Sequence, residues 1–479
     1  MGTSKLSTKS WIALGIVLAI TIFLWAVPTS FFGIEGLTPV MQRTIAIFVF
    51  TALMWIIEVI PTWTTSVMSM VIMLLTISNK GLGFMIFDGA GTMVDYKSIM
   101  AAFADPVIML FLGGFVLAIA ASKVGLDVIL ARLLLKPFGK NPKMVLLGFL
   151  FIIGFFSMFM SNTATAAMFL TFLTPVLATL PSDEKGKVGL ALAIPIAANL
   201  GGMGTPIGTP PNAIALGALQ NAGIAVTFPD WMIRMVPYVV VMLLLAWVLL
   251  LFMFPFKTKS VELKIEGTSN ASKRDKIIVS ITFAVTIILW MGEAIFGISS
   301  NIVALIPFAV FTATGVFSKD DLKEIDWSVL WMVAGGFALG TALNKTGLAS
   351  ALINAIPFAS WNILLVMIAG GLICWILSNF ISNSAAANLI IPILAVVGTA
   401  LLDDPTASGS FIALGGLKSL IVGVAMCASL AMTLPISTPP NALAHSTGII
   451  KTWQMAIVGL IIGVVGIVLA YLMLVVIGF

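Results

Sequence analysis

The sequence predicts an all-α polytopic membrane protein built as an inverted repeat, and three observations support this. Only 9% of the 479 residues are charged, and the mean hydropathy is +1.16, whereas about a quarter of the residues of a soluble domain carry charge. Apolar stretches of about 20 residues, the length of a spanning helix, recur along the chain. Two uncommon polar motifs each occur twice, in the same order, within apolar sequence.

Several stretches have the length and composition of simple spanning helices. The first lacks the small-residue cleavage site of a secretory signal, so we expect it to span. The formal charge of +5 comes from basic residues in short loops and gives no indication of nucleic-acid binding. The expected simple spans are 11–27, 41–60, 62–79, 106–122, 232–255, 275–296, 300–317, 328–344 and 453–477.

Four longer regions are each interrupted in the middle by polar residues or prolines. Regions 143–180 and 362–401 each hold two apolar arms, about half a membrane long, around a Ser-Asn cluster, which predicts re-entrant hairpins. Regions 188–222 and 411–447 each contain Thr-Pro-Pro-Asn. Consecutive prolines cannot lie inside a continuous helix, so we expect spanning helices with an unwound centre. Such backbone is tolerated at membrane depth only inside protein or against a water-filled cavity.

The distribution of basic residues orients the chain. If each hairpin counts as no crossing and each broken helix as one, the chain has eleven crossings. With a cytoplasmic N-terminus, most of the 24 lysines and arginines lie inside, as the positive-inside rule requires. The C-terminus then lies outside a cytoplasmic (inner) membrane. We expect an N-terminal segment with the first helix at 1–40, a first repeat at 41–255, a cytoplasmic linker at 256–276 and a second repeat at 277–479.

Equivalent motifs in the two halves are separated by nearly constant offsets. An odd number of predicted crossings lies between equivalent elements, so the copies must face opposite ways across the membrane. Inverted repeats with broken helices are typical of secondary transporters, whose site lies at the repeat interface near the midplane. The matched motifs are Gly113-Gly114-Phe115 with Gly335-Gly336-Phe337, Lys123 with Lys345, Ser161-Asn162-Thr163 with Ser382-Asn383-Ser384, and Thr209–Asn212 with Thr438–Asn441.

The repeated clusters contain hydroxyls, carboxamides, glycines and prolines, with no lysine or arginine in the hairpin tips or the breaks. Hydroxyl, carboxamide and free carbonyl oxygens suit a hard cation such as Na⁺. Half-helix N-termini present free N–H groups that suit a carboxylate. One such cluster alone would indicate a packing face of small residues. A cluster that is duplicated together with a proline break instead indicates a binding site.

Other residues give weaker indications. Glu58, Asp105 and Glu293 lie at the ends of predicted spans, where interfacial charges or helix caps are expected more than a proton relay. The sequence contains no set of nucleophile, histidine and acid and no metal-ligand cluster, so we expect no enzyme.

With these motifs the chain resembles the divalent anion:sodium symporter (DASS) family, the INDY-type transporters, from about residue 40 onward. The resemblance implies a homodimer in which each protomer has a scaffold and an elevator-type transport domain. It implies di- and tricarboxylate substrates, or sulfate in some branches. The substrate-binding residues implied are Asn162, Thr163, Thr209, Pro210, Asn383, Ser384, Thr438 and Pro439. The implied sodium ligands are Ser157, Ser161, Asn162 and the Gly208 carbonyl at one site, and Ser378, Asn383 and the Ser437 carbonyl at its mirror.

The sequence therefore predicts Na⁺-coupled import of C4-dicarboxylates such as succinate, malate and fumarate. The expected partners are the carboxylate, sodium ions, the lipid bilayer and a second copy of the chain. The alternative is a Na⁺-independent exchanger of di- or tricarboxylates, and Ser157 and Ser378 favour sodium coupling. A passive channel fits the duplicated, broken elements less well. Ser384 stands where the family usually has threonine, which makes this position a candidate determinant of selectivity.

Overall fold

The computed structural model describes residues 8–178, 180–181, 183–261, 271–355 and 362–479. Within these residues all regular elements are helices, which confirms the all-α prediction. The start of the chain and residues 262–270 of the expected linker lie outside the described residues. Seven helical stretches of the described part are long and apolar enough to cross a membrane. The eleven-crossing topology and the division into repeats stay predictions.

Most of the expected simple spans are helices in the structure. They are α1 (Thr8–Ala26), α2 (Pro39–Ile57), α3 (Thr62–Thr76), α5 (Pro106–Lys123), α11 (Phe228–Met253), α12 (Lys273–Met291), α16 (Trp327–Lys345) and α23 (Thr452–Val476). One expectation of a continuous helix was wrong, because Gly292 separates α12 from a short α13 (Glu293–Phe296). The expected stretch 300–317 contains α14 (Ser300–Val303) and α15 (Leu305–Thr314), which are joined through Ala304 in α-helical conformation and form one apolar helix, Ser300–Thr314.

Two short helices not predicted from the sequence follow the repeated Gly-Leu pairs. Gly125 and Gly347 adopt left-handed backbone, with φ of +71° and +81°, a conformation that glycine enters without steric cost. They turn the chain out of α5 and α16 into α6 (Leu126–Leu135) and α17 (Leu348–Ala355). The repeat seen in the sequence therefore marks equivalent helix endings. Two further short helices are α4 (Tyr96–Ala101) and α20 (Ser408–Ala413).

The predicted hairpins consist of α7 (Pro142–Ser157) with α8 (Asn162–Ala178), and α18 (Ile363–Ser378) with α19 (Asn383–Asp403). Their lengths of 16, 17, 16 and 21 residues correspond to roughly 24–32 Å at 1.5 Å per residue. The hydrocarbon core is about 30 Å thick. The arms are therefore much longer than the half-membrane length expected, and α19 is long enough to cross alone.

The two predicted breaks separate α9 (Gly186–Gly202) from α10 (Pro210–Asn221) and α21 (Gly416–Ser429) from α22 (Pro439–Ser446). The paired prolines begin α10 and α22, where the missing N–H has no intrahelical partner to lose. The asparagine that ends each Thr-Pro-Pro-Asn motif donates hydrogen bonds to carbonyls of the unwound backbone. Asn212 Nδ2 donates to the Gly202 and Thr205 carbonyls at 3.0 and 2.8 Å. Asn441 Nδ2 donates to the Met432 and Leu434 carbonyls at 2.8 and 2.9 Å.

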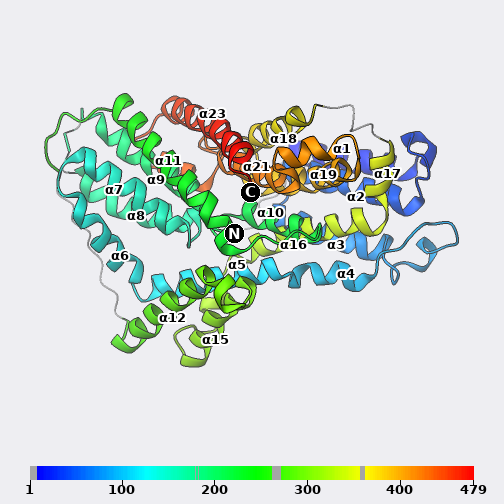
Figure 1. Ribbon diagram of the computed structural model, residues 1–479, viewed down its shortest axis with the longest axis horizontal. Coiled ribbons are helices and arrows are strands. Elements are labelled where there is room, and N and C mark those ends of the chain that lie inside the picture. The colour runs from blue at the N-terminus through cyan, green and yellow to red at the C-terminus, as the bar shows by residue number, and fades with distance from the viewer. Residues whose placement is uncertain (1–7, 179, 182, 262–270, 356–361) are drawn as a thin grey trace.

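The two halves interlock around these breaks. Helix α10 of the first half packs on α19 and α21 of the second, while α22 packs on α8 and α9 of the first. In Figure 1, α7, α8, α9 and α11 gather at the left, α12 and α15 lie at the lower edge, and α5 and α16 run through the middle. Each proline break therefore lies against helices of the other half, which places the repeated polar motifs at one interface.

The repeated Gly-Gly pair allows α16 to pack closely on both of its sides. A Cβ at Gly335 would overlap Ser66 of α3, and a Cβ at Gly336 would overlap the side chain of Asn388 of α19. One turn later, Gly340 has open space around it. The backbone of α16 therefore lies in direct contact with Ser66 of α3 on one side and with Asn388 of α19 on the other.

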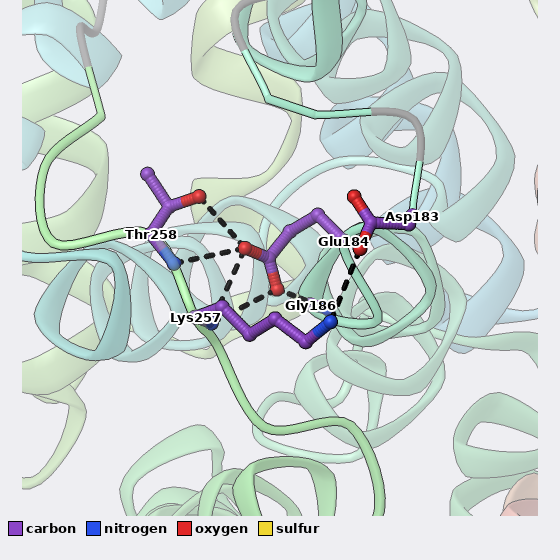
Figure 2. Close-up of polar contacts among 5 residues, drawn as sticks. All are labelled: Asp183, Glu184, Gly186, Lys257 and Thr258. Atoms are coloured by element: carbon purple, nitrogen blue, oxygen red, sulfur yellow. Dashed lines mark hydrogen bonds and ion pairs between the residues drawn. The ribbon is translucent and has the colours of Figure 1, made fainter.

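The buried carboxylate of Glu184, just before α9, forms hydrogen bonds with the chain that follows α11 (Figure 2). Glu184 is 4% exposed. It accepts hydrogen bonds from the Thr258 hydroxyl at 2.7 Å and from the backbone N–H groups of Thr258, Lys257 and Gly186. Burial alone would raise the pKa of Glu184, but the hydrogen bonds from Thr258, Lys257 and Gly186 outweigh burial and lower the pKa to about 2. The neighbouring Lys257–Asp183 ion pair, at 3.1 Å, is exposed and contributes little by comparison.

Candidate functional site

The interlocked breaks and hairpin tips surround a cavity of about 740 Å³. All the expected substrate-binding residues lie in its wall, four from each half of the chain. They are Asn162, Thr163, Thr209, Pro210, Asn383, Ser384, Thr438 and Pro439. The structure thus brings together side chains that are more than 200 positions apart in the sequence.

Four helix N-termini reach this cavity. Helices α8 and α19 begin at Asn162 and Asn383, and α10 and α22 begin at Pro210 and Pro439. The first turn of a helix leaves backbone N–H groups without intrahelical partners, and the helix dipole adds a partial positive charge there. Four such ends around one cavity form a favourable environment for an anion.

On one flank, oxygen atoms converge on the side chain of Asn162. The Ser157 hydroxyl lies 2.7 Å from both Asn162 Oδ1 and the Ala198 carbonyl. Asn162 Oδ1 faces only acceptors, and turning the amide would let its nitrogen donate to the Ala198 and Gly208 carbonyls at 3.2 Å. A cation among these oxygens would favour the amide orientation in which Oδ1 faces them. The oxygen-only set fits a hard cation, and it adds Ala198 to the ligands expected from the sequence.

The mirror cluster in the second half includes an unsatisfied oxygen. Asn383 Oδ1 is buried and has no hydrogen-bond partner among the described residues, and Ser378 Oγ is buried beside the thiol of Cys374, its hydrogen-bonding neighbour on α18. The Ser437 hydroxyl is engaged, since it donates to the Asn379 carbonyl at 3.0 Å. A buried polar atom without a partner costs free energy. These oxygens therefore fit a second cation as ligands.

The first serine of each Ser-Asn motif forms a helix cap. Ser161 Oγ accepts from the Ala164 N–H at 3.2 Å, and Ser382 Oγ accepts from the Ala385 N–H at 3.2 Å. Capping of this type fixes the first turn of a helix. Ser161 is expected from the sequence to be a sodium ligand, and in the structure its hydroxyl makes this capping bond and lies in the cavity wall.

Several residues of the cavity wall were not predicted from the sequence, among them two acids and an asparagine. Glu324 and Asp326 bring carboxylates to the wall, whereas the described lining includes no lysine or arginine. Asn199 of α9 is buried and donates to Thr438 Oγ1 at 3.1 Å. Asn199 is an isolated polar residue in an apolar stretch, which is the signal that could have identified it.

Of the acids at the span ends, Asp105 has the expected role of a helix cap, whereas Glu58 and Glu293 accept hydrogen bonds from distant parts of the chain, Glu58 from the backbone N–H of Ser382 in the second Ser-Asn motif. Asp105 caps α5 by accepting from the Val107 N–H at 2.8 Å. Glu293 accepts from the Phe228 N–H at 3.2 Å, at the start of α11. Glu58 ends α2 in a left-handed conformation with φ of +50°.

Comparison with known proteins identifies the family. The family model described as citrate transporter, CitMHS, matches residues 52–415. The chain belongs to the CitMHS citrate transporter family. This family is related to the divalent anion:sodium symporters, which confirms the relationship expected from the motifs. Membership makes the chain a transporter and not an enzyme.

Several relatives align with most of this CitMHS chain. An uncharacterized transporter of Haemophilus influenzae is 30% identical over 474 residues, or 94% of each chain. The sodium-dependent dicarboxylate transporter SdcS of Staphylococcus saprophyticus is 28% identical over 465 residues, or 89% of this chain and 84% of SdcS. An uncharacterized transporter of Schizosaccharomyces pombe is 31% identical over 84% of this chain. The alignment spans only 45% of the yeast protein.

A solved structure shares the fold. The YdaH transporter of Alcanivorax borkumensis superposes with a TM-score of 0.54, covering 80% of this chain and 87% of YdaH at 13% identity. At this identity the likeness concerns the fold alone. It supports the multi-pass helical architecture of this CitMHS protein.

Proposed function

We propose that this CitMHS protein is a secondary active transporter that imports C4-dicarboxylates such as succinate, malate and fumarate together with sodium ions. The observation that carries the proposal is a single cavity where four helix N-termini meet between two clusters of oxygen atoms. The name of the SdcS relatives, sodium-dependent dicarboxylate transporter, supports the same substrate class and ion.

Electrostatics explains why cations and a dianion would bind together. The described cavity wall offers hydroxyls, carboxamides and helix N-termini but no cationic side chain, and Glu324 and Asp326 add negative charge. A dicarboxylate alone would therefore lack full charge compensation. Sodium ions at the Asn162 and Asn383 clusters would supply it, and each ion would bind more tightly when the dianion is present. Each net positive charge carried inward gains about 2.3 kcal/mol per 100 mV of membrane potential.

We propose an elevator mechanism of alternating access. In it, α7–α11 and α18–α23 would carry the cavity as one body past α5 and α16. The close approach of α16 to α19 at Gly336 supports an interface along which helices can slide. The homodimer, the cytoplasmic-membrane location and the placing of the N-terminus inside and the C-terminus outside belong to the same proposal.

Uptake by purified protein in liposomes tests the function. Labelled succinate should accumulate when sodium is outside and should not when choline replaces it, with malate and fumarate as effective competitors. Sulfate and citrate belong in the same competition panel, since the family name includes citrate. Sodium-independent counterflow of succinate at full rate would instead establish the exchanger, and non-saturable flux would indicate a channel.

A further inference from the structure

An asparagine of the first half controls the hydrogen bonding of a threonine in the second. Asn199 lies on α9 and is 1% exposed. Its Nδ2 donates to Thr438 Oγ1 at 3.1 Å and to Asn441 Oδ1 at 3.2 Å. Both Asn199 and Thr438 belong to the wall of the 740 Å³ cavity. The contact thus joins the two halves of the chain at the candidate site.

The orientation of the Asn199 amide follows from its neighbours. Asn441 Nδ2 donates to two carbonyls of its own break, those of Met432 and Leu434. Asn441 Oδ1 must therefore be the atom that faces Asn199, and it needs a donor. Among the residues that the structure describes, the NH₂ group of Asn199 supplies this donor. The opposite atom, Asn199 Oδ1, has no partner among the described residues.

This arrangement occupies both acceptor positions of the Thr438 hydroxyl. Thr438 Oγ1 accepts from the Asn199 side chain at 3.1 Å and from the backbone N–H of Asn441 at 3.3 Å. A hydroxyl has two lone pairs and one proton, so Thr438 retains only its donor. No acceptor for this proton occurs among the described residues, and Thr438 lines the cavity.

The equivalent threonine of the first half differs. Thr209 begins α10 in the same way, but its side chain makes no capping hydrogen bond, and no carboxamide of the described residues contacts its hydroxyl. The Thr209 hydroxyl can therefore act as donor or acceptor, whereas Thr438 can only donate. The two repeats are thus chemically unequal at otherwise matched positions.

We infer that Asn199 is a positioning residue that makes the Thr438 hydroxyl a dedicated hydrogen-bond donor to a substrate carboxylate. The inference rests on the proposed function, because it needs an anionic acceptor in the cavity. Asn199 acts through Thr438 and need not touch the substrate. Removing it frees a lone pair of Thr438, so the hydroxyl can rotate away, and the carboxylate loses a prearranged donor.

A double-mutant cycle on succinate uptake by the reconstituted protein tests this. We expect Asn199→Ala to raise KM for succinate about tenfold, the effect of weakening a hydrogen bond to a charged group, while the maximal rate changes less than twofold. Thr438→Val should raise KM similarly, and adding Asn199→Ala to Thr438→Val should raise it little further. Thr438→Ser should reverse most of the rise in KM seen with Thr438→Val, because serine supplies the same donor.

Asn199→Asp keeps the size of the side chain and tests the same inference if Asn199→Ala does not fold. Its carboxylate would accept the Thr438 proton and turn the donor away from the cavity, so KM should rise in the wild-type background and much less with Thr438→Val. Asn388→Ala is the matched control for KM: its amide contacts α16 at Gly336 and Met332, where a change can alter the maximal rate, but the KM for succinate should stay at the wild-type value. Asn388 is also buried with an unpartnered Oδ1, but it lines a separate cavity of about 490 Å³ between α10, α16, α17 and α19.

The outcomes separate the inference from the function. If the wild type takes up no carboxylate, the proposed function is wrong. If the wild type takes up succinate and Asn199→Ala leaves KM unchanged, the inference is overturned and the function stands. The inference is also overturned if Asn199→Ala raises KM equally in the Thr438 and Thr438→Val backgrounds, because Asn199 would then act through the general packing of α22.

Discussion

Removal of the Asn162 carboxamide is the sharpest test of the first oxygen cluster. Asn162 Oδ1 lies with the Ser157 hydroxyl and the Ala198 and Gly208 carbonyls, within 2.7 to 3.2 Å of each. Asn162→Ala deletes one of these four oxygens. A hydrogen bond to a charged group contributes about 1.5–3 kcal/mol, and we take an ion–oxygen contact to be of similar size. This corresponds to a roughly 10- to 150-fold weaker affinity for the cation.

The effect should extend beyond sodium. Asn162 also begins α8 in the cavity wall, so its loss should weaken succinate binding as well and reduce uptake to background at ordinary sodium concentrations. The assay is initial-rate uptake in proteoliposomes across a sodium titration, with folding checked by size-exclusion chromatography. A monodisperse Asn162→Ala protein with the wild-type sodium dependence would refute the assignment of this cluster to a cation.

Four further predictions follow from the structure. Asn383→Ala should abolish uptake in the same manner, and normal transport by this variant would refute the assignment of the Asn383 cluster to a second cation. Ser384→Thr should change the preference among carboxylates in competition assays and leave the sodium dependence unchanged. Gly336→Ala should slow uptake with succinate binding retained, because the new methyl group would meet α19, whereas Gly340→Ala, in open space, should have wild-type rates. Glu184→Gln should lower the melting temperature in detergent at pH 7. The pKa of Glu184 is about 2 in the folded protein, against 4.5 ordinarily, so its carboxylate stabilises the fold above about pH 4.5, and this contribution is lost as pH falls toward 2. The variant should therefore lose less stability than the wild type on acidification, and equal losses would contradict this role.

The sequence was sufficient to predict the helical class, and it indicated eight residues that the structure brings into one cavity wall. Apolar length identifies spans, and the paired prolines mark the first residues of α10 and α22. The repeat indicated that distant motifs would converge. The structure places Asn162 and Asn383, and Thr209 and Thr438, in one cavity wall, as that reasoning required.

Features that depend on packing between halves were not predictable in the same way. The bond between Asn199 and Thr438 joins residues 239 positions apart, and no spacing rule within one helix indicates it. The hydrogen bonds from Asn441 to the unwound carbonyls of Met432 and Leu434 were not predicted either, since the asparagines of the motifs were considered as ligands. The lengths of α7, α8, α18 and α19 were underestimated at half a membrane, whereas the serines at the tips cap α8 and α19 at their first turns and the helices run on from there.

We propose that a carboxylate and sodium ions bind to this cavity together. Calorimetric titration of succinate into the purified protein at increasing sodium concentration, with choline keeping the ionic strength constant, tests it directly. Linkage requires that two ligands which favour each other do so reciprocally. We expect the Kd for succinate to fall steeply as the sodium concentration rises, and we expect this fall to be lost in Asn162→Ala. A Kd for succinate that is independent of sodium would contradict it.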